Sequence, residues 1–466
     1  MRASKKSFLI LICFAAAMGG FLFGYDWVVV GGAKPFYEPY FGLDSAHLKG
    51  WGTSSALIGC IFGAMFCFWA ADKYGRRNLL VLSALLFAAS ALGTALSHEF
   101  AWYNISRIVG GFGIGIALNL SPMYIAEMAP PDMRGKLVSI NQLMVMFGIL
   151  AAQLVNWRIS LVDASLSPDA TAAAIRDSWN GQFGWRYMFG AQVVPSAIFF
   201  MLMVAMPESV RWLVKKGRKA QARKILEKIG GTAYAEFEER SISESLAEER
   251  KLSRSPYKEL LTPELLRILW LGIFIAVLQQ WCGMNVIFYY AADIFEAAGY
   301  TLKELMLQIV VIGTIMVLSV LLTIAIVDKV GRKFLMLSGL ASLAAIYLVE
   351  GALFYFGVKG IAIVALTLLS VAVYSLTLAP VVWVILSEIF PNRVRGAAMS
   401  LAVVTLWIAN FLLTYTFPVI KESLGWTLNF WLYAVICSIG FAVLKLKLPE
   451  TKGKSLEEIE KIILKK

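Results

Sequence analysis

Charged residues are scarce in this chain of 466 residues, at 16%, compared with about 25% in a typical soluble protein. Hydrophobic residues make up 59% of the chain instead. This balance excludes a soluble globular enzyme, a disordered chain and a fibrous repeat. Uncharged runs such as residues 79–97 and 361–387 are long enough to cross a bilayer, which takes about 20 apolar residues. The sequence therefore predicts an all-α polytopic membrane protein.

Cysteine and histidine are also rare, with five and two residues. The cysteines all fall in apolar spans, at spacings that do not suit metal binding, so we expect small buried thiols rather than disulfides or metal ligands. Both histidines, His47 and His98, fall in predicted outer loops. The sequence carries no nucleophile–base set and no nucleotide motif. We therefore expect neither an enzyme nor a bound metal or cofactor.

The apolar runs predict twelve membrane spans, at residues 8–32, 51–71, 79–97, 102–126, 136–158, 185–206, 266–291, 306–327, 334–355, 362–387, 397–420 and 427–446. A long segment rich in Lys, Arg and Glu separates the sixth span from the seventh, and its pattern is typical of surface helices. We expect four parts, which are an N-terminal six-helix half (1–206), a cytoplasmic amphipathic helical linker (207–263), a C-terminal six-helix half (264–448) and a cytoplasmic tail (449–466).

Positive charge is distributed unevenly between the two sides of the predicted spans. When residues at or next to a span edge are counted with the adjacent connection, thirty-four of the 43 Lys and Arg residues lie in the termini and the even-numbered connections, eight lie in the odd-numbered connections, and Arg107 lies inside a span. Because Lys and Arg are enriched in cytoplasmic loops, we expect both termini in the cytoplasm. The net charge of +12 thus reflects membrane topology, and we expect no nucleic-acid partner.

Three motifs occur at matching positions in both halves. They are DKYGRR (72–77) and DKVGRK (328–333), the Glu–Arg pairs spaced by seven (Glu127 and Arg134, Glu388 and Arg395), and PES (207–209) and PET (449–451). Internal repeats of this kind in transporters place the substrate near the membrane midplane, between halves that rock against each other.

Together these strings resemble the major facilitator superfamily, and specifically its sugar porter family. The resemblance also includes GYD (24–26), RIVGG (107–111), QQWCGMN (279–285), PVVW (380–383) and SEIFPNRVR (387–395). SPMYIAE (121–127) and GWRYMF (184–189) are most similar to the bacterial D-xylose/proton symporters. The resemblance implies two pseudo-symmetric six-helix halves and a monomer in the inner membrane that imports a monosaccharide, D-xylose or a similar pentose, with a proton. Alternatives are a hexose or polyol symporter, an uncoupled facilitator or a transporter-like sugar sensor.

Two buried charges are expected to carry the proton coupling. Asp26 lies well inside the first span and Arg107 lies in the fourth, and charges at this depth normally pair. With Arg107 adjacent, Asp26 stays ionised; with Arg107 turned away, desolvation favours the protonated acid. In the family that this sequence resembles, the corresponding Asp carries the proton. A static ion pair is the alternative. Glu350, late in the ninth span, is expected near the outer interface or in a structural pair.

Amides and aromatic rings are expected to bind the sugar. Side-chain amides can both donate and accept hydrogen bonds, and aromatic rings pack against the C–H faces of a sugar. The expected substrate-binding residues are Phe23, Gln142, Gln279, Gln280, Asn285, Tyr289, Trp383 and Trp407. Gly283 permits local unwinding of the seventh span. For a single amide, a bond between helices is the alternative role.

Four positions depart from the pattern of the xylose symporters. Ile149 and Leu406 stand where Gln is expected, Met316 where Asn is expected, and Phe288 where a smaller aliphatic residue is expected. These changes make the predicted pocket drier and narrower. We expect a pentose to fit better than a hexose, although the lost amides also weaken the case for xylose itself.

A duplicated set of charges at the inner ends of the spans is expected to gate the transporter. Its members are Asp72, Arg76, Arg77, Glu127, Arg134, Glu208, Asp328, Arg332, Lys333, Glu388, Arg393, Arg395 and Glu450. Arg–carboxylate pairs are geometrically specific, so these would latch the two halves together when the outside is open and separate when the inside opens. Solvated loop charge is the alternative.

Overall fold

The protein is helical throughout the described residues of the computed structural model, which are 3–131, 133–163, 170–252, 259–391 and 394–452. The first half contains α1 (Ala3–Phe41), α2 (Ala46–Tyr74), α3 (Arg76–Ala95), α4 (Phe100–Met128), α5 (Arg134–Ser160), a 3₁₀ turn (Leu161–Asp163), α6 (Ala172–Asp177), a π-helical turn (Asn180–Gly184), α7 (Trp185–Gly190) and α8 (Val193–Ala205). Within it, α1 packs on α5 and α2 packs on α4.

Glycines let these helices approach closely, as is common where lipid-embedded helices pack. A Cβ atom on Gly24 of α1 would lie 2.0 Å from the carbonyl oxygen of Val145 on α5. A Cβ atom on Gly111 of α4 would lie 1.8 Å from the carbonyl oxygen of Ala56 on α2. A larger residue at Gly24 would push α1 away from α5, and one at Gly111 would push α4 away from α2.

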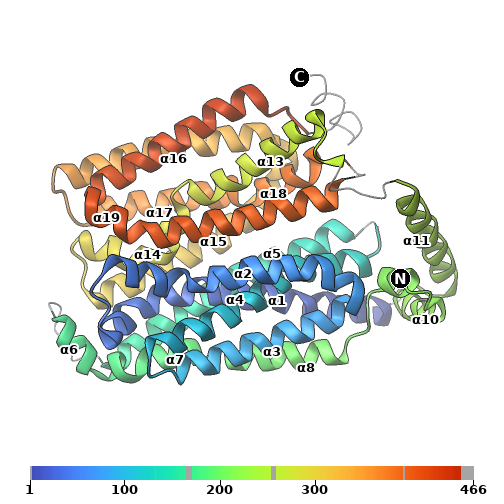
Figure 1. Ribbon diagram of the computed structural model, residues 1–466, viewed down its shortest axis with the longest axis horizontal. Helices are drawn as coiled ribbons and strands as arrows, with labels where there is room; N and C mark the ends of the chain where they lie inside the picture. Colours follow the sequence, from blue (N-terminus) through green and yellow to red (C-terminus); the bar gives the residue numbers. More distant parts are fainter. Residues whose placement is uncertain (1–2, 132, 164–169, 253–258, 392–393, 453–466) are drawn as a thin grey trace.

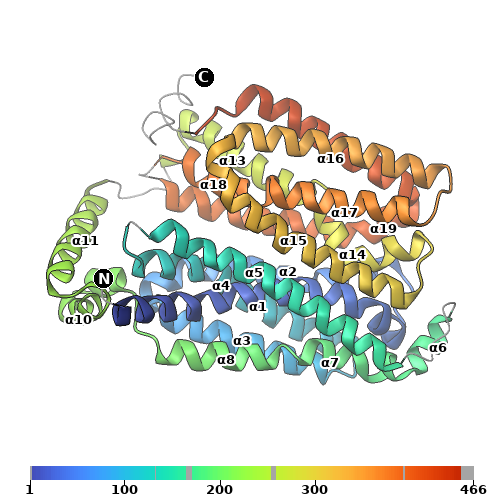
Figure 2. The ribbon, with the colours of Figure 1, turned by 180° about the vertical axis from the view of Figure 1, so that it is seen from behind.

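Three short helices join the halves: α9 (Val210–Lys215), α10 (Lys219–Gly230) and α11 (Thr232–Leu252). The second half contains α13 (Pro263–Trp281), α14 (Met284–Ala297), α15 (Leu302–Val330), α16 (Arg332–Tyr355), α17 (Ile361–Leu376), α18 (Leu378–Ile389) and α19 (Arg395–Lys447). Figures 1 and 2 show α10 and α11 beyond one end of the bundle, where α1 begins. We call this end the terminal face and the other end, which carries α6, the opposite face.

Several predicted spans are broken helices. Gly283 has φ +90°, a left-handed conformation suited to glycine, and it separates α13 from α14 as predicted. The tenth span breaks at Thr377, and Pro380 follows, which cannot donate the backbone bond that a continuous helix requires. Eleven described helical segments are long and apolar enough to cross a membrane. The last, α19, reverses at Gly425 (φ +69°), so the chain makes twelve passes.

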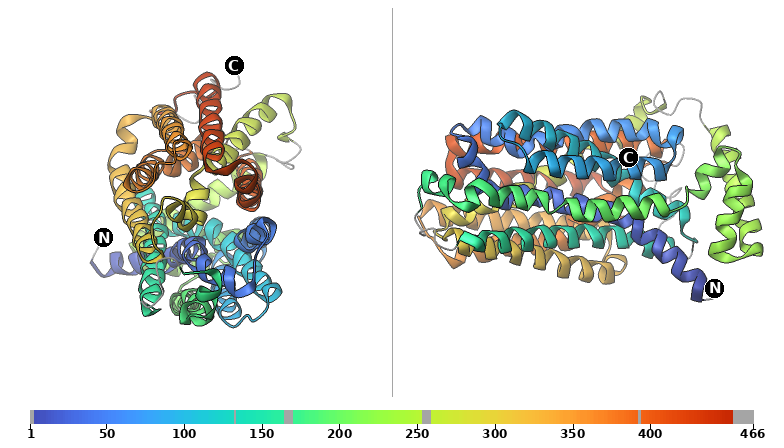
Figure 3. Two further views of the ribbon diagram at one scale, coloured as in Figure 1. Left: turned by 90° about the vertical axis from the view of Figure 1, so that its left-hand side faces the viewer. Right: turned by 90° about the horizontal axis from the view of Figure 1, so that it is seen from below.

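The two halves meet along three helix pairs, which are α2 with α19, α5 with α15, and α1 with α14. Seen along the helices, the halves form two separate groups (Figure 3, left). The predicted fold class, an all-α membrane protein of twelve helices, is therefore confirmed. The helices α1 and α14 carry residues of the predicted proton-coupling and sugar-binding sites.

Candidate functional site

Asp26 and Arg107 form a fully buried ion pair in the first half. Asp26 is 0% exposed and Arg107 is 3% exposed. Arg107 Nη1 donates to Asp26 Oδ1 at 2.6 Å, and Arg107 Nη2 donates to the backbone oxygen of Asp26 at 3.4 Å. Gln192 Nε2 donates to the second carboxylate oxygen, Oδ2, at 3.1 Å. Both carboxylate oxygens therefore accept from a side-chain donor in this conformation.

Gln192 was not predicted from the sequence. It is 1% exposed and lies at the break between α7 and α8, where the helix axis shifts and the amide turns toward α1. A single amide in an apolar span does not indicate its partner, because it could face any neighbouring helix. Its bond to the only acid in the first predicted span is a property of the folded packing.

A small cavity adjoins the ion pair. Its volume is about 10 Å³, the space of roughly one water molecule. It is lined by Phe23, Asp26, Trp27, Thr53, Ala56, Leu57, Cys60, Arg107, Ile114, Tyr289 and Trp407. Three of the predicted sugar-binding aromatic residues therefore share a cavity wall with both members of the predicted proton-coupling pair.

Three predicted amides lie together at the break in the seventh span. Asn285 Nδ2 donates to Gln280 Oε1 at 2.6 Å, and Gln280 Nε2 donates to Gln279 Oε1 at 3.3 Å. Gln279 Nε2 in turn donates to the backbone oxygen of Ala379 on α18 at 3.4 Å. These bonds keep the amides satisfied within the membrane, and the two longest of them are weak enough to exchange for a ligand.

The other predicted sugar-binding residues come from several helices. Tyr289 and Trp407 are each 3% exposed. Trp407 Nε1 is buried and has no hydrogen-bond partner among the described residues. Phe23 contacts Trp407 edge-on, with ring centres 6.2 Å apart. Gln142 on α5 and Trp383 on α18 are both partly exposed.

The four departures from the xylose-symporter pattern are all buried. Ile149 is 0%, Met316 2%, Leu406 3% and Phe288 4% exposed. The Phe288 ring contacts Trp27 on α1, with centres 5.1 Å apart, and Tyr374 on α17, with centres 6.2 Å apart. This added ring therefore occupies space between the two halves, beside the predicted site.

A second charged cluster, unpredicted from the sequence, joins the halves at the opposite face. Lys34 Nζ on α1 lies 2.5 Å from Asp293 Oδ2 on α14, and Lys421 Nζ on α19 lies 3.1 Å from Asp293 Oδ1. Glu38 lies 3.6 Å from Lys34, whose ammonium group also lies 4.3 Å from the centre of the Tyr290 ring. With its side chain only 4% exposed, Lys34 therefore links α1 of the first half to α14 of the second at the opposite face.

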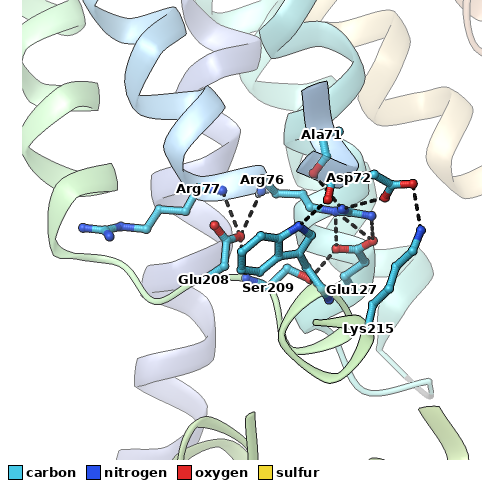
Figure 4. A network of polar contacts seen from close by, with 9 residues as sticks. Ala71, Asp72, Arg76, Arg77, Glu127, Glu208, Ser209 and Lys215 are labelled. Carbon is cyan, nitrogen blue, oxygen red and sulfur yellow. Dashed lines mark hydrogen bonds and ion pairs between the residues drawn. The ribbon is translucent and has the colours of Figure 1, made fainter. Parts of the chain in front are cut away.

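The charges at the terminal face of the first half form a dense network (Figure 4). Arg76 binds Glu127 through Nε and Nη2 at 3.0 Å and binds Asp72 through Nη1 at 3.1 Å. Glu208 Oε1 accepts from the backbone N–H groups of Arg76 and Arg77, at 2.9 and 3.0 Å. Because these N–H groups begin α3, the carboxylate also meets the positive end of the helix dipole.

The second half repeats part of this network. Glu450 accepts from the backbone N–H groups of Arg332 and Lys333, at 3.0 and 3.1 Å, and thus binds the start of α16 as Glu208 binds the start of α3. Arg332 lies 3.5 Å from Glu388. In all of these contacts, each carboxylate therefore binds a partner in its own half.

The other predicted gating residues vary in placement. Arg134 is exposed at the start of α5. Arg77 donates to backbone oxygens at the end of α8, including that of Met203 at 3.2 Å. Arg395 Nε donates to the backbone oxygen of Phe390 at 3.2 Å. The side chain of Asp328 and the whole of Arg393 lie outside the described residues.

Glu350 is more deeply buried than the sequence suggested. Its exposed fraction is 0%, so it does not lie at an aqueous interface. Thr367 Oγ1 donates to Oε1 at 2.6 Å, while Oε2 is buried without a hydrogen-bond partner among the described residues. The alternative prediction, a structural pair, holds in the form of a hydroxyl–carboxyl bond between α16 and α17.

Comparison with known proteins agrees with this architecture. Residues 12–463 match the family described as "Sugar (and other) transporter". The chain is 38% identical to the arabinose-proton symporter of Bacillus subtilis (strain 168), over 100% of this chain and 97% of that protein. It is 36% identical to the D-xylose-proton symporter of Escherichia coli (strain K12), over 98% and 96% of the two chains.

Solved structures show the same fold. The partially occluded inward open conformation of the xylose transporter XylE from E. coli superposes with a TM-score of 0.83 at 33% identity, covering 96% of this chain and 100% of that one. The resemblance inferred from the motifs is thereby confirmed. The chain belongs to the sugar transporter family, the sugar porters of the major facilitator superfamily.

Proposed function

We propose that this protein is a proton-coupled symporter that imports a monosaccharide, D-xylose or a similar pentose, by alternating access. The observation that carries the proposal is the buried Asp26–Arg107 pair, which shares a cavity with aromatic residues of the predicted sugar site. An acid at this depth that can exchange a guanidinium group for a proton supplies the coupling step. The relatives named as arabinose-proton and D-xylose-proton symporters support the same class of substrate.

The terminal face is cytoplasmic in this proposal, and the opposite face is the outer face. The ion pairs of Asp293 hold the outer ends of α1, α14 and α19 together, whereas the inner charges bind partners in their own halves. This combination supports an inward-facing conformation. The protein acts as a single copy in the inner membrane, with both termini in the cytoplasm.

The transport cycle follows from these contacts. When the outer face opens, water reaches Asp26, and a proton replaces Arg107 and Gln192 on its carboxylate. The sugar then binds the amides at the break in the seventh span, whose hydrogen bonds to one another exchange for bonds to sugar hydroxyls. The halves rock, the outer charges pair again, and the sugar leaves toward the cytoplasm. Return of Arg107 to Asp26 releases the proton on the inner side.

Counterflow with a panel of sugars tests this proposal in vesicles that contain wild-type protein or the Asp26→Asn variant. Counterflow measures exchange without a proton gradient, whereas accumulation requires coupling. We expect the variant to retain exchange of pentoses and to lose accumulation. Asp177→Asn is the matched control, because Asp177 is exposed and pairs with its neighbour Arg176. Full accumulation by Asp26→Asn would refute proton coupling through this acid and favour an uncoupled facilitator or another coupling group.

The same panel separates the substrate alternatives. Faster exchange of glucose or of a polyol than of xylose and arabinose would replace the pentose with that substrate. Sugar-dependent alkalinisation of the medium distinguishes a symporter from a facilitator, and robust uptake into proteoliposomes excludes a sensor that binds sugar without moving it.

A further inference from the structure

We propose that Trp27 is a specificity-determining residue of the sugar site, which limits the size of the sugar and donates a hydrogen bond to it. This inference rests on the proposed function, because it assigns a residue to that same site. Trp27 follows Asp26 on α1, and neither the repeat motifs nor the amide cluster includes it. The evidence comes from its ring contacts, its unpaired N–H group and its cavity.

The Trp27 ring connects the two halves across the predicted site. It stacks on Phe23 one turn earlier in α1, with ring centres 5.5 Å apart and planes 10° apart. Its other neighbour is Phe288 on α14, which it meets edge-on at 5.1 Å and 75°. Since α1 and α14 belong to different halves, this contact must change whenever the halves rock.

The indole nitrogen of Trp27 is buried and has no hydrogen-bond partner among the described residues. The same is true of the indole nitrogen of Trp407, and both residues line the cavity beside Asp26. A buried N–H group normally has an acceptor. Two unpaired donors on the wall of one cavity, next to flat aromatic faces, suit a ligand with hydroxyl oxygens and C–H faces, which is the chemistry of a sugar.

The bulk of Trp27 and Phe288 limits the space for that ligand. The cavity that Trp27 lines holds about 10 Å³ in this conformation, and Phe288 packs edge-on against the Trp27 ring, so a sugar enters only when the rings separate. The Trp27 ring, which stays on α1, then forms the wall of the sugar site next to Asp26. A pentose lacks the hydroxymethyl group of a hexose, and we therefore assign to Trp27 the rejection of this extra group.

Two substitutions separate the size of the ring from its hydrogen bond. Trp27→Phe keeps a ring but removes the N–H group, and we expect it to weaken binding of xylose and glucose alike by roughly three- to tenfold. Trp27→Ala removes both, and we expect the preference for xylose over glucose to fall by roughly tenfold or more, within the range by which one extra group discriminates in a pocket. Trp102→Ala is the control, because Trp102 is 60% exposed on α4.

The measurement is the ratio of kcat/KM for xylose and glucose in counterflow, together with sugar binding to the purified full-length protein by titration calorimetry. An unchanged ratio in Trp27→Ala, with pentose exchange intact, overturns the role of Trp27 and leaves the proposed function standing. A wild-type protein that binds neither sugar overturns both. If Trp27→Ala fails to fold, Trp27→Leu gives the same comparison with a smaller loss of volume.

Discussion

Replacing Asp293 with asparagine is expected to open the opposite face of the bundle, which is the outer face in the proposed orientation. Asp293 pairs with Lys34 at 2.5 Å and with Lys421 at 3.1 Å, and it is the acid that joins α14 to both α1 and α19. Asparagine has nearly the same shape but no charge. The Asp293→Asn variant therefore leaves two ammonium groups close together, and the buried one, Lys34, retains Glu38, 3.6 Å away, and the Tyr290 ring.

The size of the effect follows from burial. Breaking a fully buried ion pair costs about 3–5 kcal/mol, but the side chains of Asp293 and Lys421 are 19% and 32% exposed, and an asparagine oxygen still accepts a hydrogen bond. We expect a penalty of about 2 kcal/mol, discounted for this exposure. The penalty applies only to the closed outer face, because separated side chains meet water. The ratio of outward-open to inward-facing molecules should then rise roughly thirtyfold, at 1.4 kcal/mol for each factor of ten.

Cys60 provides a reporter of this equilibrium. It is 0% exposed and lines the cavity beside Asp26 and Arg107, so a water-soluble reagent reaches it from outside only after the outer face opens. A variant that retains Cys60 as its single cysteine can be labelled in right-side-out vesicles with a membrane-impermeant maleimide. We expect Asp293→Asn to accelerate this labelling by roughly tenfold or more, but by less than the roughly thirtyfold change in the ratio of outward-open to inward-facing molecules.

Two variants make the experiment specific to the ion cluster. Asp293→Glu keeps the charge and should label at close to the rate of the parent protein. Glu296→Gln removes an exposed acid from the same helix and should have no effect. Labelling of Asp293→Asn at the parent rate would show that the cluster does not hold the outer face closed, and the energetic reasoning above would fail.

Two further predictions concern carboxyl groups that bind hydroxyl or backbone donors. Glu350→Gln preserves an acceptor for Thr367, so transport and stability should remain near wild type. Thr367→Val removes the hydroxyl that donates to Glu350 and should lower the free energy of unfolding by about 1–3 kcal/mol. A large coupling defect in Glu350→Gln would instead assign this acid to proton transport. Glu208→Ala and Glu450→Ala each remove an acceptor from two N–H groups at a helix start, and each should cost about 1–2 kcal/mol, measured by thermal unfolding in detergent; a loss confined to one of the two would contradict their equivalence.

The sequence predicted the fold well because membrane insertion imposes simple rules on it. Long apolar runs give the helices, and the duplicated motifs give the two halves. The pairing of Asp26 with Arg107 was predictable for a related reason, since a charge deep in the membrane needs a partner and these were the obvious candidates. The break at Gly283 was predictable from local chemistry, as glycine tolerates the left-handed conformation found there.

The outer cluster could not be predicted in the same way. The first span was expected to end at residue 32, yet α1 continues to Phe41 through Pro35 and Pro39, and this extension carries Lys34 into the protein. Lys34 and Asp293 are separated by 259 residues, and they meet where α1 of one half packs on α14 of the other. A contact that depends on conformation leaves little trace in the pattern of a single sequence.

In the proposed cycle, the predicted gating charges explain why the transporter needs two sets of partners. Arg76 and Arg332 lie at the starts of equivalent helices, and each finds acids within its own half while the outer face is closed. Opening the outer face separates Lys34 from Asp293, and this loss must be offset for both states to be populated. The charges at the terminal face would supply that offset if they left partners in their own half and paired across the two halves. Ion pairs broken at the outer face would then be replaced by ion pairs at the terminal face. With the two terms nearly balanced, the smaller free energies of sugar binding and of protonation at Asp26 would determine the direction of transport in the proposed cycle.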